Sequence, residues 1–290
     1  MAVSWGKHQQ AELHTIPFSQ YSEIARWSMQ LAGEDFEEKS YLPTHHLTSL
    51  TSSRRKRTRL GASSRRCDDS PCYVAPDGER LDDCWQILER FMGEVPADLV
   101  ELLSCEVGPQ VAALFQHFIL APEMADAWRS VGVAAPVKWW QRRLWGIASS
   151  RIGAAMRGCV AKDAAFVVSA QKSLDEALSK LERLLLQPGN PFTPQEDGRP
   201  SPAGLALASL LAPLVDVEDY TCGRCNIVRM AGGLGAFPQP FQKLVEECQS
   251  RPVGKFVLET YKERMNFRTE STTESSPDDD FDLSPYPGLF

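Results

Sequence analysis

The pattern of apolar residues changes once along the chain, and this change limits the architectures available to it. Before Val95-Pro96, short extended runs alternate with helical periodicity; after it, apolar residues recur at three- and four-residue spacing and strand signals stop. Strands in one half and helices in the other predict an α+β fold class. The chain has 290 residues, of which 43% are hydrophobic, so it has enough apolar material for two domains.

The first half is predicted to contain four strands and two helices, joined by turns and by one long loop. Helical periodicity starts at Tyr21 and stops at Gly33, a residue that commonly ends helices. The later turn at Asp77-Gly78 has the composition of a tight reversal between extended segments. The predicted strands are 11–18, 36–42, 70–74 and 79–81, and the predicted helices are 21–33 and 83–91.

The second half is predicted to be entirely helical. Ser201 and Pro202 are a favourable N-cap and first helical residue for the most apolar of its helices. The Pro- and Gly-rich stretch 187–199 predicts a loop. The predicted helices are 99–118, 136–152, 161–186, 203–215, 241–248 and 253–263. We therefore expect an N-terminal domain at 1–94, a helical domain at 95–267 and a disordered acidic tail at 268–290.

The charges are distributed unevenly. The net charge is −7, yet the loop 48–66 carries seven cations and no acid, whereas the C-terminal end is acidic. We interpret the loop 48–66 as a solvated insertion, although its cations could also attract an anionic ligand, and nucleic-acid binding is not favoured. No apolar run is long enough to span a membrane and no signal peptide precedes the first strand, so we expect a cytoplasmic protein with reduced cysteines.

Five segments, taken in order, resemble the glutathione transferase superfamily. They are 16–27 around Ser19, 70–74 around Pro71, 77–88 around Asp83-Cys84, 191–208 and 250–264. Each resemblance is weak alone, but the ordered set covers most of the chain. It implies a thioredoxin-like βαβ–ββα domain that binds glutathione as a co-substrate, followed by a helical bundle.

Ser19 lies where the resemblance places the catalytic hydroxyl, between the first strand and the first helix. A helix N-terminus stabilises an anion, and a hydroxyl can donate a hydrogen bond to a thiolate. We therefore expect Ser19 to lower the thiol pKa of bound glutathione. The alternative is that Ser19 is only a helix N-cap, and Ser22 is a second candidate for the same role. Because serine forms no mixed disulfide, thiol–disulfide exchange at this residue is excluded.

The remaining predicted glutathione contacts are Ser70, Pro71, Asp83 and Cys84. The resemblance implies a cis peptide bond at Pro71 and pairing of the Ser70 main chain with the cysteinyl backbone of glutathione. It also implies that the pair 83–84 binds the γ-glutamyl end. Cys84 replaces the usual hydroxyl and is a weaker donor, which predicts reduced affinity. Alternatively, Pro71 is an ordinary trans proline, and Asp82 or Asp83 is only a helix cap.

The glycyl carboxylate of glutathione requires a cation, and the sequence offers several. The candidates are Lys39, His45, His46, Arg54 and Arg55. The pair His45-His46 could indicate a metal, but no further ligand lies at a telling spacing, so we predict no metal site. The family's capping box is also incomplete here, because Gly204 stands where a carboxylate usually follows Ser201.

Two further groups of residues have alternative interpretations. Cys222 and Cys225 have the spacing of a redox or zinc pair, but we interpret them as two thiols in a surface loop. The aromatic residues of the helical half could form an apolar pocket for a second substrate. We interpret them instead as core. They are Trp139, Trp140, Trp145 and Phe166.

The resemblance predicts an enzyme that conjugates glutathione to small electrophiles, and a homodimer. The alternative is a non-catalytic binding or scaffold module of the same fold, which the replacement at Cys84 and the two charged segments favour. Reduction or dehalogenation with glutathione is the least favoured, because position 19 is Ser and not Cys.

Overall fold

The computed structural model of the chain describes residues 10–43, 71–160, 164–223 and 225–271. The N-terminal part contains the strands β1 (Ala11–Thr15), β2 (Phe36–Ser40), β3 (Cys72–Val74) and β4 (Arg80–Leu81) and the helices α1 (Gln20–Leu31) and α3 (Cys84–Met92). The helical part contains α4 (Ala97–Glu101), a π-helical turn η1 (Leu102–Val107), α5 (Gly108–Ile119), α6 (Ala125–Ala134), α7 (Trp139–Val160), α8 (Ala164–Leu185), α9 (Pro202–Leu211), α10 (Ile227–Met230), α11 (Gln239–Ser250) and α12 (Pro252–Ser271).

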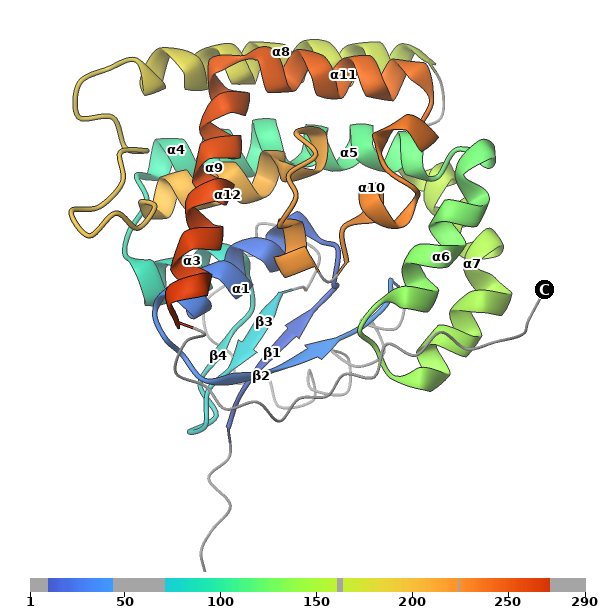
Figure 1. Cartoon of the computed structure of the whole chain (residues 1–290), viewed down its shortest axis with the longest axis horizontal. Helices are drawn as coiled ribbons and strands as arrows, with labels where there is room; N and C mark the ends of the chain where they lie inside the picture. The colour runs from blue at the N-terminus through green and yellow to red at the C-terminus, as the bar shows by residue number, and fades with distance from the viewer. Residues whose placement is uncertain (1–9, 44–70, 161–163, 224, 272–290) are drawn as a thin grey trace, which may run out of the picture.

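The four strands form one mixed sheet in the order β2-β1-β3-β4 (Figure 1). β1 is parallel to β2 and antiparallel to β3, and β3 is antiparallel to β4. This is a thioredoxin-like βαβ–ββα arrangement, followed by helices alone, so the predicted α+β fold class is confirmed. The predicted basic loop 48–66 and Ser70 lie outside the described residues.

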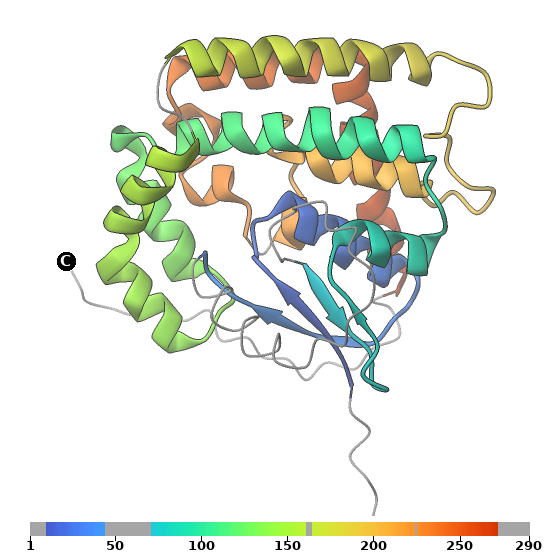
Figure 2. The same ribbon diagram turned by 180° about the vertical axis from the view of Figure 1, so that it is seen from behind.

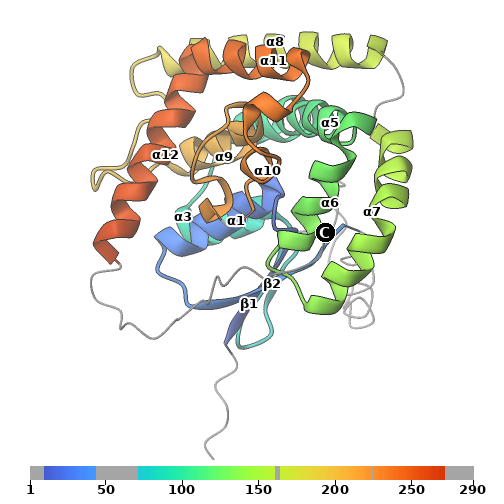
Figure 3. The same cartoon turned by 45° about the vertical axis from the view of Figure 1, so that its right-hand side comes forward.

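Helix α1 lies between two layers and is buried on nearly all sides. One side covers the sheet through the buried face of β1, and the other packs against α9 of the helical layer (Figure 1, Figure 3). The charged residues Glu23 and Arg26 are buried in addition to the apolar Ile24 and Trp27, whereas Leu31 is only half-buried.

The predicted helix 99–118 is divided into three pieces. Pro109 has no N–H to donate, and its ring would clash with the carbonyl four residues earlier in a regular helix. The chain widens into the π-helical turn η1 immediately before Gly108 and then continues as α5. From behind, α5 packs along α8 (Figure 2).

The other helical boundaries also differ from the prediction in places. Helix α6 occupies a segment for which the sequence predicts no helix, and α7 begins at Trp139, three residues after the predicted start. Helix α12 continues to Ser271. Among the described helices, none combines the length and apolar character of a membrane span.

The predicted N-cap of α9 is confirmed. The Ser201 Oγ accepts a hydrogen bond from the Gly204 N–H at 3.1 Å and donates one to the Pro191 carbonyl at 2.7 Å. A Cβ at position 204 would lie 3.2 Å from the Phe256 ring and 3.3 Å from the Phe192 carbonyl. This close packing explains the absence of a capping-box carboxylate, because a side chain at position 204 would be crowded.

Candidate functional site

The site predicted from the sequence lies at the edge of the sheet where β1 ends. The pairing of β1 with β3 and of β3 with β4, continued by one or two residues, places Thr15, Pro71 and Asp83 next to one another. β1 and β4 run in the same direction, so the helix that follows each of them begins at this edge. Ser19 and Cys84 stand at these two helix starts.

Ser19 is the N-cap residue of α1. Its backbone is extended, with φ −81° and ψ 130°, and its carbonyl accepts the Glu23 N–H at 3.0 Å. Its N–H donates to the Ile16 carbonyl at 3.0 Å and closes the turn after β1. The half-buried side chain makes no capping bond, and its hydroxyl has no hydrogen-bond partner within the described ranges. The hydroxyl is therefore available to a ligand at the N-terminus of α1.

Ser22, the second candidate for this role, is engaged elsewhere. It is fully buried, and its Oγ accepts a hydrogen bond from the Ile16 N–H at 3.2 Å. This bond ties the first turn of α1 to the end of β1. Of the two serines, only Ser19 presents a hydroxyl that the fold does not use.

Pro71 is buried directly before β3, at the same edge. Its predicted cis peptide bond joins it to Ser70, which lies outside the described residues, so that bond and the Ser70 contact remain predictions. Continuation of the β1–β3 register places Pro71 beside the end of β1.

Asp83 and Cys84 form the start of α3 and behave differently from each other. The Asp83 Oδ1 accepts the Trp85 N–H at 2.7 Å and the Gln86 N–H at 3.0 Å, so this carboxylate is the helix cap. Both bonds go to Oδ1. Cys84 is 1% exposed and belongs to the hydrophobic core. Its side chain is therefore shielded from solvent, and its main chain stands at the start of α3.

Two helix N-termini at one sheet edge make a favourable place for an anion. Each contributes unpaired N–H groups and the positive end of a helix dipole. At α3, the Asp83 carboxylate already uses part of this potential, whereas at α1 the cap side chain does not. The α1 start is therefore the better of the two for a thiolate.

Among the predicted cation candidates for the glycyl carboxylate, only Lys39 belongs to the described residues. Its Nζ lies 2.5 Å from the Glu12 carboxylate and 3.5 Å from that of Glu37. The hydrogen bond to Glu12 raises the pKa of Lys39. Its charge is therefore compensated within the sheet. The other candidates, His45, His46, Arg54 and Arg55, lie outside the described residues.

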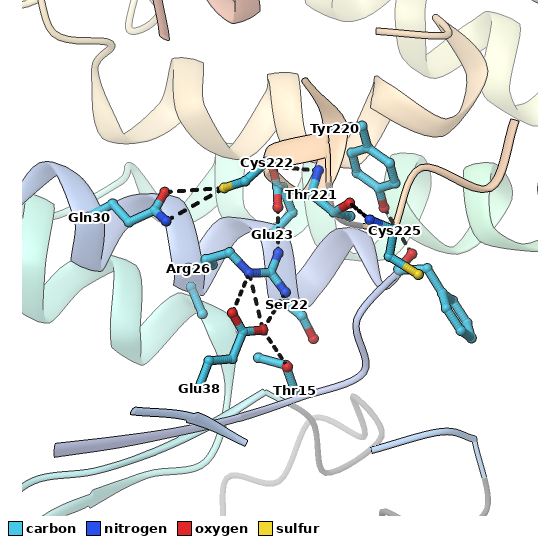
Figure 4. A network of polar contacts seen from close by, with 12 residues as sticks. Thr15, Ser22, Glu23, Arg26, Gln30, Glu38, Tyr220, Thr221, Cys222 and Cys225 are labelled. Carbon is cyan, nitrogen blue, oxygen red and sulfur yellow. Dashed lines mark hydrogen bonds and ion pairs between the residues drawn. The ribbon is translucent and has the colours of Figure 1, made fainter. Parts of the chain in front are cut away.

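A buried polar network beneath the site escaped prediction. Arg26 on α1 lies 2.6 Å from the Glu23 carboxylate and makes a forked contact with Glu38 on β2, at 2.7 and 3.0 Å (Figure 4). The Thr15 hydroxyl donates to the same Glu38 at 2.7 Å. Strand β2, helix α1 and the end of β1 are thereby joined by charge-assisted bonds under the site.

The helical half completes this network through α12. Arg264 pairs with the Glu23 carboxylate, and its guanidinium lies 4.4 Å from the centre of the Trp27 ring. Burial would raise the pKa of Glu23, but the guanidiniums of Arg264 and Arg26 outweigh it and hold that pKa below its ordinary value. The network fixes α1, and with it Ser19, against the helical domain. A signal was present in the sequence, since Glu23 and Arg26 are the charged residues of α1.

Cys222 and Cys225 are buried, so their interpretation as thiols in a surface loop is wrong. The Cys222 Sγ lies 3.0 Å from Arg264 Nη2 and 3.5 Å from Gln30 Nε2, within the buried network. The Cys225 sulfur points away from that of Cys222 (Figure 4). Burial raises the pKa of Cys225 to about 12. In the described part of the chain, no cluster of His, Cys, Asp and Glu could hold a metal ion.

The helical domain reaches the site through aromatic contacts that differ from those predicted. The Phe18 ring, next to Ser19, packs edge-on against Trp128 of α6 at 5.9 Å between centroids. The Tyr220 hydroxyl donates to the Phe18 carbonyl at 3.0 Å. Of the four aromatic residues interpreted as core, only one, Trp145, is fully buried. The other three are exposed: Trp139, Trp140 and Phe166.

No family model and no curated protein matches the chain. Solved structures that are similar to it include apo glutathione S-transferase III, with 16% identity, 86% of this chain and 96% of that chain covered, and a TM-score of 0.42. A glutathione S-transferase of Ceriporiopsis subvermispora in complex with glutathione shows 11% identity, coverage of 93% and 99%, and a TM-score of 0.44.

Ure2p5 from Phanerochaete chrysosporium, cocrystallized with 1-(S-glutathionyl)-2,4-dinitrobenzene, shows 12% identity, coverage of 94% and 100%, and a TM-score of 0.43. Two of these three structures are described as glutathione S-transferases. Similarities this distant do not assign an activity to this chain.

Proposed function

We propose that this protein is a glutathione transferase in which Ser19 stabilises the glutathione thiolate for attack on a small electrophile. The observation that supports this most directly is the Ser19 hydroxyl, which stands at the N-terminus of α1 without serving as its side-chain cap. The N-cap position of a helix is suited to an anion, and a hydroxyl there that forms no capping bond can donate a hydrogen bond to a ligand.

The rest of glutathione would lie along the same edge. Its γ-glutamyl ammonium would meet the Asp83 carboxylate, and its γ-glutamyl carboxylate would meet the main-chain N–H at the start of α3. Its cysteinyl backbone would pair with the chain at Ser70, next to Pro71. Cys84 would contribute its main chain alone, because its thiol is in the core.

The chemistry requires little of the protein beyond holding the thiolate. The Ser19 O–H donates a hydrogen bond to sulfur, which favours the ionised form and lowers the thiol pKa. With an aromatic halide as electrophile, the thiolate adds to the ring carbon, a carbon–sulfur bond forms, and the halide leaves as the anion. Ser19 makes no covalent bond and stays unchanged.

A non-catalytic glutathione-binding module is the second candidate. It is favoured by the start of α3, where the Asp83 carboxylate already occupies two N–H groups and Cys84 offers no side-chain donor. Such a protein would bind glutathione weakly and without turnover. The same resemblance leads us to expect a cytoplasmic protein that forms a homodimer. Sedimentation of the purified protein would test the homodimer.

Two measurements separate these proposals. Calorimetric titration with glutathione tests binding, and the conjugation of glutathione to 1-chloro-2,4-dinitrobenzene tests catalysis. For the enzyme, we expect both to be positive, with Ser19→Ala lowering kcat by about 10²–10³-fold, the usual loss for one donor to a developing anion. The exposed Ser130 on α6 provides a control, and Ser130→Ala should retain full activity.

The outcomes are distinct. Binding without conjugation would support the module and exclude the enzyme. Conjugation that survives in Ser19→Ala would remove Ser19 from the mechanism while leaving the transferase in place. Absence of both binding and turnover would overturn both proposals.

A further inference from the structure

The outward face of α7 is an apolar and cationic surface on a water-exposed helix. Ile147 is 83% exposed, Trp139 is 65% exposed and Leu144 is 48% exposed. Arg143 and Arg151 flank Ile147 at four-residue spacing, so the three side chains lie on one side of the helix. We name this set of five residues the α7 face. In Figure 3 the helix stands at the outside of the molecule, beyond α6.

The charges on α7 and just before it are all of one sign. Residues 138–160 contain five cations and no acid, in a chain whose net charge is −7. None of these cations forms an ion pair with another described residue. Some exposed basic residues elsewhere in the described ranges do have acidic partners, such as Lys180 with Glu106 at 2.6 Å. The α7 face thus combines exposed apolar surface with uncompensated positive charge, a combination suited to an acidic partner that also carries apolar residues.

The chain itself contains a segment with the complementary composition. Residues 272–290 follow the end of α12 and contain five acids and no cation. Four of the acids, Asp278, Asp279, Asp280 and Asp282, surround Phe281, and Leu283 follows. We propose that the segment 277–284 binds the α7 face of the same molecule, with its aspartates on Arg143 and Arg151 and its Phe281 and Leu283 over Ile147 and Leu144.

The segment is joined to the rest of the chain at Ser271, the end of α12. Phe281 is ten residues beyond Ser271, and ten extended residues reach about 33–36 Å. This tether keeps the segment close to the folded part of the same molecule and so raises its effective concentration there.

An intramolecular acidic segment fits this face better than an anionic membrane does. The whole chain carries a net charge of −7, and its own acidic segment would compete with lipid headgroups for the same arginines. The tethered segment is already part of the same chain, so it does not have to bring a negatively charged protein to an anionic surface. It also brings apolar side chains to Ile147 as well as charge to the arginines. Binding of the α7 face to an anionic membrane is therefore the alternative that the experiments must exclude.

Photo-cross-linking of the full chain tests the proposal. Phe281 is replaced by photoreactive p-benzoylphenylalanine, and the cross-linked peptides are identified by mass spectrometry. We expect intramolecular products concentrated at residues 139–151. The double variant Arg143→Glu/Arg151→Glu should lower their yield at least about fivefold, because two ion pairs become two repulsions. Raising the salt concentration to about 1 M should also lower the cross-linking yield in the protein that keeps Arg143 and Arg151, because salt screens the ion pairs.

Two controls accompany the double variant. Arg183→Glu reverses an exposed arginine on α8 and should leave the cross-linking yield unchanged. Arg54→Glu/Arg55→Glu reverses charges in the basic loop and should also leave it unchanged. Cross-links that move to residues 54–66, that join two chains, or that are spread over the surface would overturn the proposal.

A vesicle-binding experiment tests the alternative partner, an anionic membrane. Full-length protein is mixed with phosphatidylcholine vesicles containing a third of phosphatidylserine. We expect no binding that depends on Arg143 and Arg151. Binding that the Arg143→Glu/Arg151→Glu variant loses, together with no cross-linking at α7, would assign the α7 face to a membrane and overturn the proposal.

Discussion

The two helices that begin at the site edge are held in opposite ways. Helix α3 is capped by its own Asp83 carboxylate, which accepts two N–H groups of the first turn. Helix α1 has Ser19 at the equivalent place, and that side chain caps nothing. What holds α1 is its surroundings: the sheet on one side, the helical domain on the other, and the pairing of Glu23 with Arg26 and Arg264.

This difference shows at which helix starts the side chain of the cap residue can bind a ligand without loss of stability. A helix that depends on its cap cannot give the cap residue to a ligand without losing stability. Because α1 is fixed by burial and by ion pairs, its cap position is left for chemistry. We therefore expect loss of the ion pairs of α1 to cost more stability than loss of either cap residue.

Removing the central carboxylate of the network should have the largest effect. Glu23→Ala leaves Arg26 and Arg264 buried without one of their acidic partners, and we expect it to lower the free energy of unfolding by about 3–5 kcal/mol. Urea denaturation followed by circular dichroism measures this. As a control, Glu106→Ala breaks the exposed pair with Lys180 and should cost less than about 1 kcal/mol. Equal losses in the two variants would show that α1 does not depend on its ion pairs.

The same carboxylate should give stability a pH dependence. The pKa of Glu23 is held below its ordinary value of 4.5 in the folded protein, so the ionised form stabilises the fold above that pH. As the pH falls below 4.5 toward the lowered folded pKa, this stabilisation should be lost. The difference in unfolding free energy between the wild type and Glu23→Gln should therefore shrink on acidification. A difference that stays constant between neutral pH and about pH 3 would contradict the assignment.

The two cap residues should respond differently to truncation. Asp83→Ala removes a cap and should lower the free energy of unfolding by about 0.5–2 kcal/mol. Ser19→Ala removes no capping bond and should change it by less than about 0.5 kcal/mol. Thermal and urea unfolding of both variants provides the comparison. If Ser19→Ala proved as destabilising as Asp83→Ala, its hydroxyl would belong to the helix and not to a ligand.

The smallest expected effect concerns Cys84. Its side chain is in the core, so Cys84→Ser should change glutathione affinity by less than about twofold. Asp83→Asn keeps a capping oxygen but removes the charge that would face the γ-glutamyl ammonium, and should weaken binding about tenfold. Calorimetric titration measures both. A marked gain of affinity in Cys84→Ser would show that position 84 does present a side chain to the ligand.

Local patterns predicted the parts of the fold that local forces determine. The first two strands, the cap at Asp83 and the cap at Ser201 are each encoded within a few residues of sequence, and each is found. The position of Ser19 at the first strand–helix junction could be predicted for the same reason. The break at Gly108-Pro109 is encoded locally as well, since proline cannot continue a regular helix, but the predicted helix 99–118 missed it.

The remaining features depend on residues that are distant in sequence. Glu23 contacts Arg264 across 241 positions, and no local pattern indicates that partner. Cys222 lies in a stretch whose composition is typical of a surface turn, and only the packing of that turn against α1 makes it buried. The charged character of α1 would ordinarily predict a solvent-facing side, which the helical layer covers.

The pairing of Glu23 with Arg264 also has a consequence for biosynthesis. The ribosome makes the carboxylate early and its second guanidinium partner 241 residues later. At about 5–20 residues per second, this interval lasts roughly 12–50 seconds. Throughout that time α1 lacks its final ion pair, and α9 covers its outer side only in the last part of the interval. The core between the sheet and α1 consists of residues within 11–87 and can form earlier, whereas the surroundings of α1 are complete only when α12 leaves the exit tunnel.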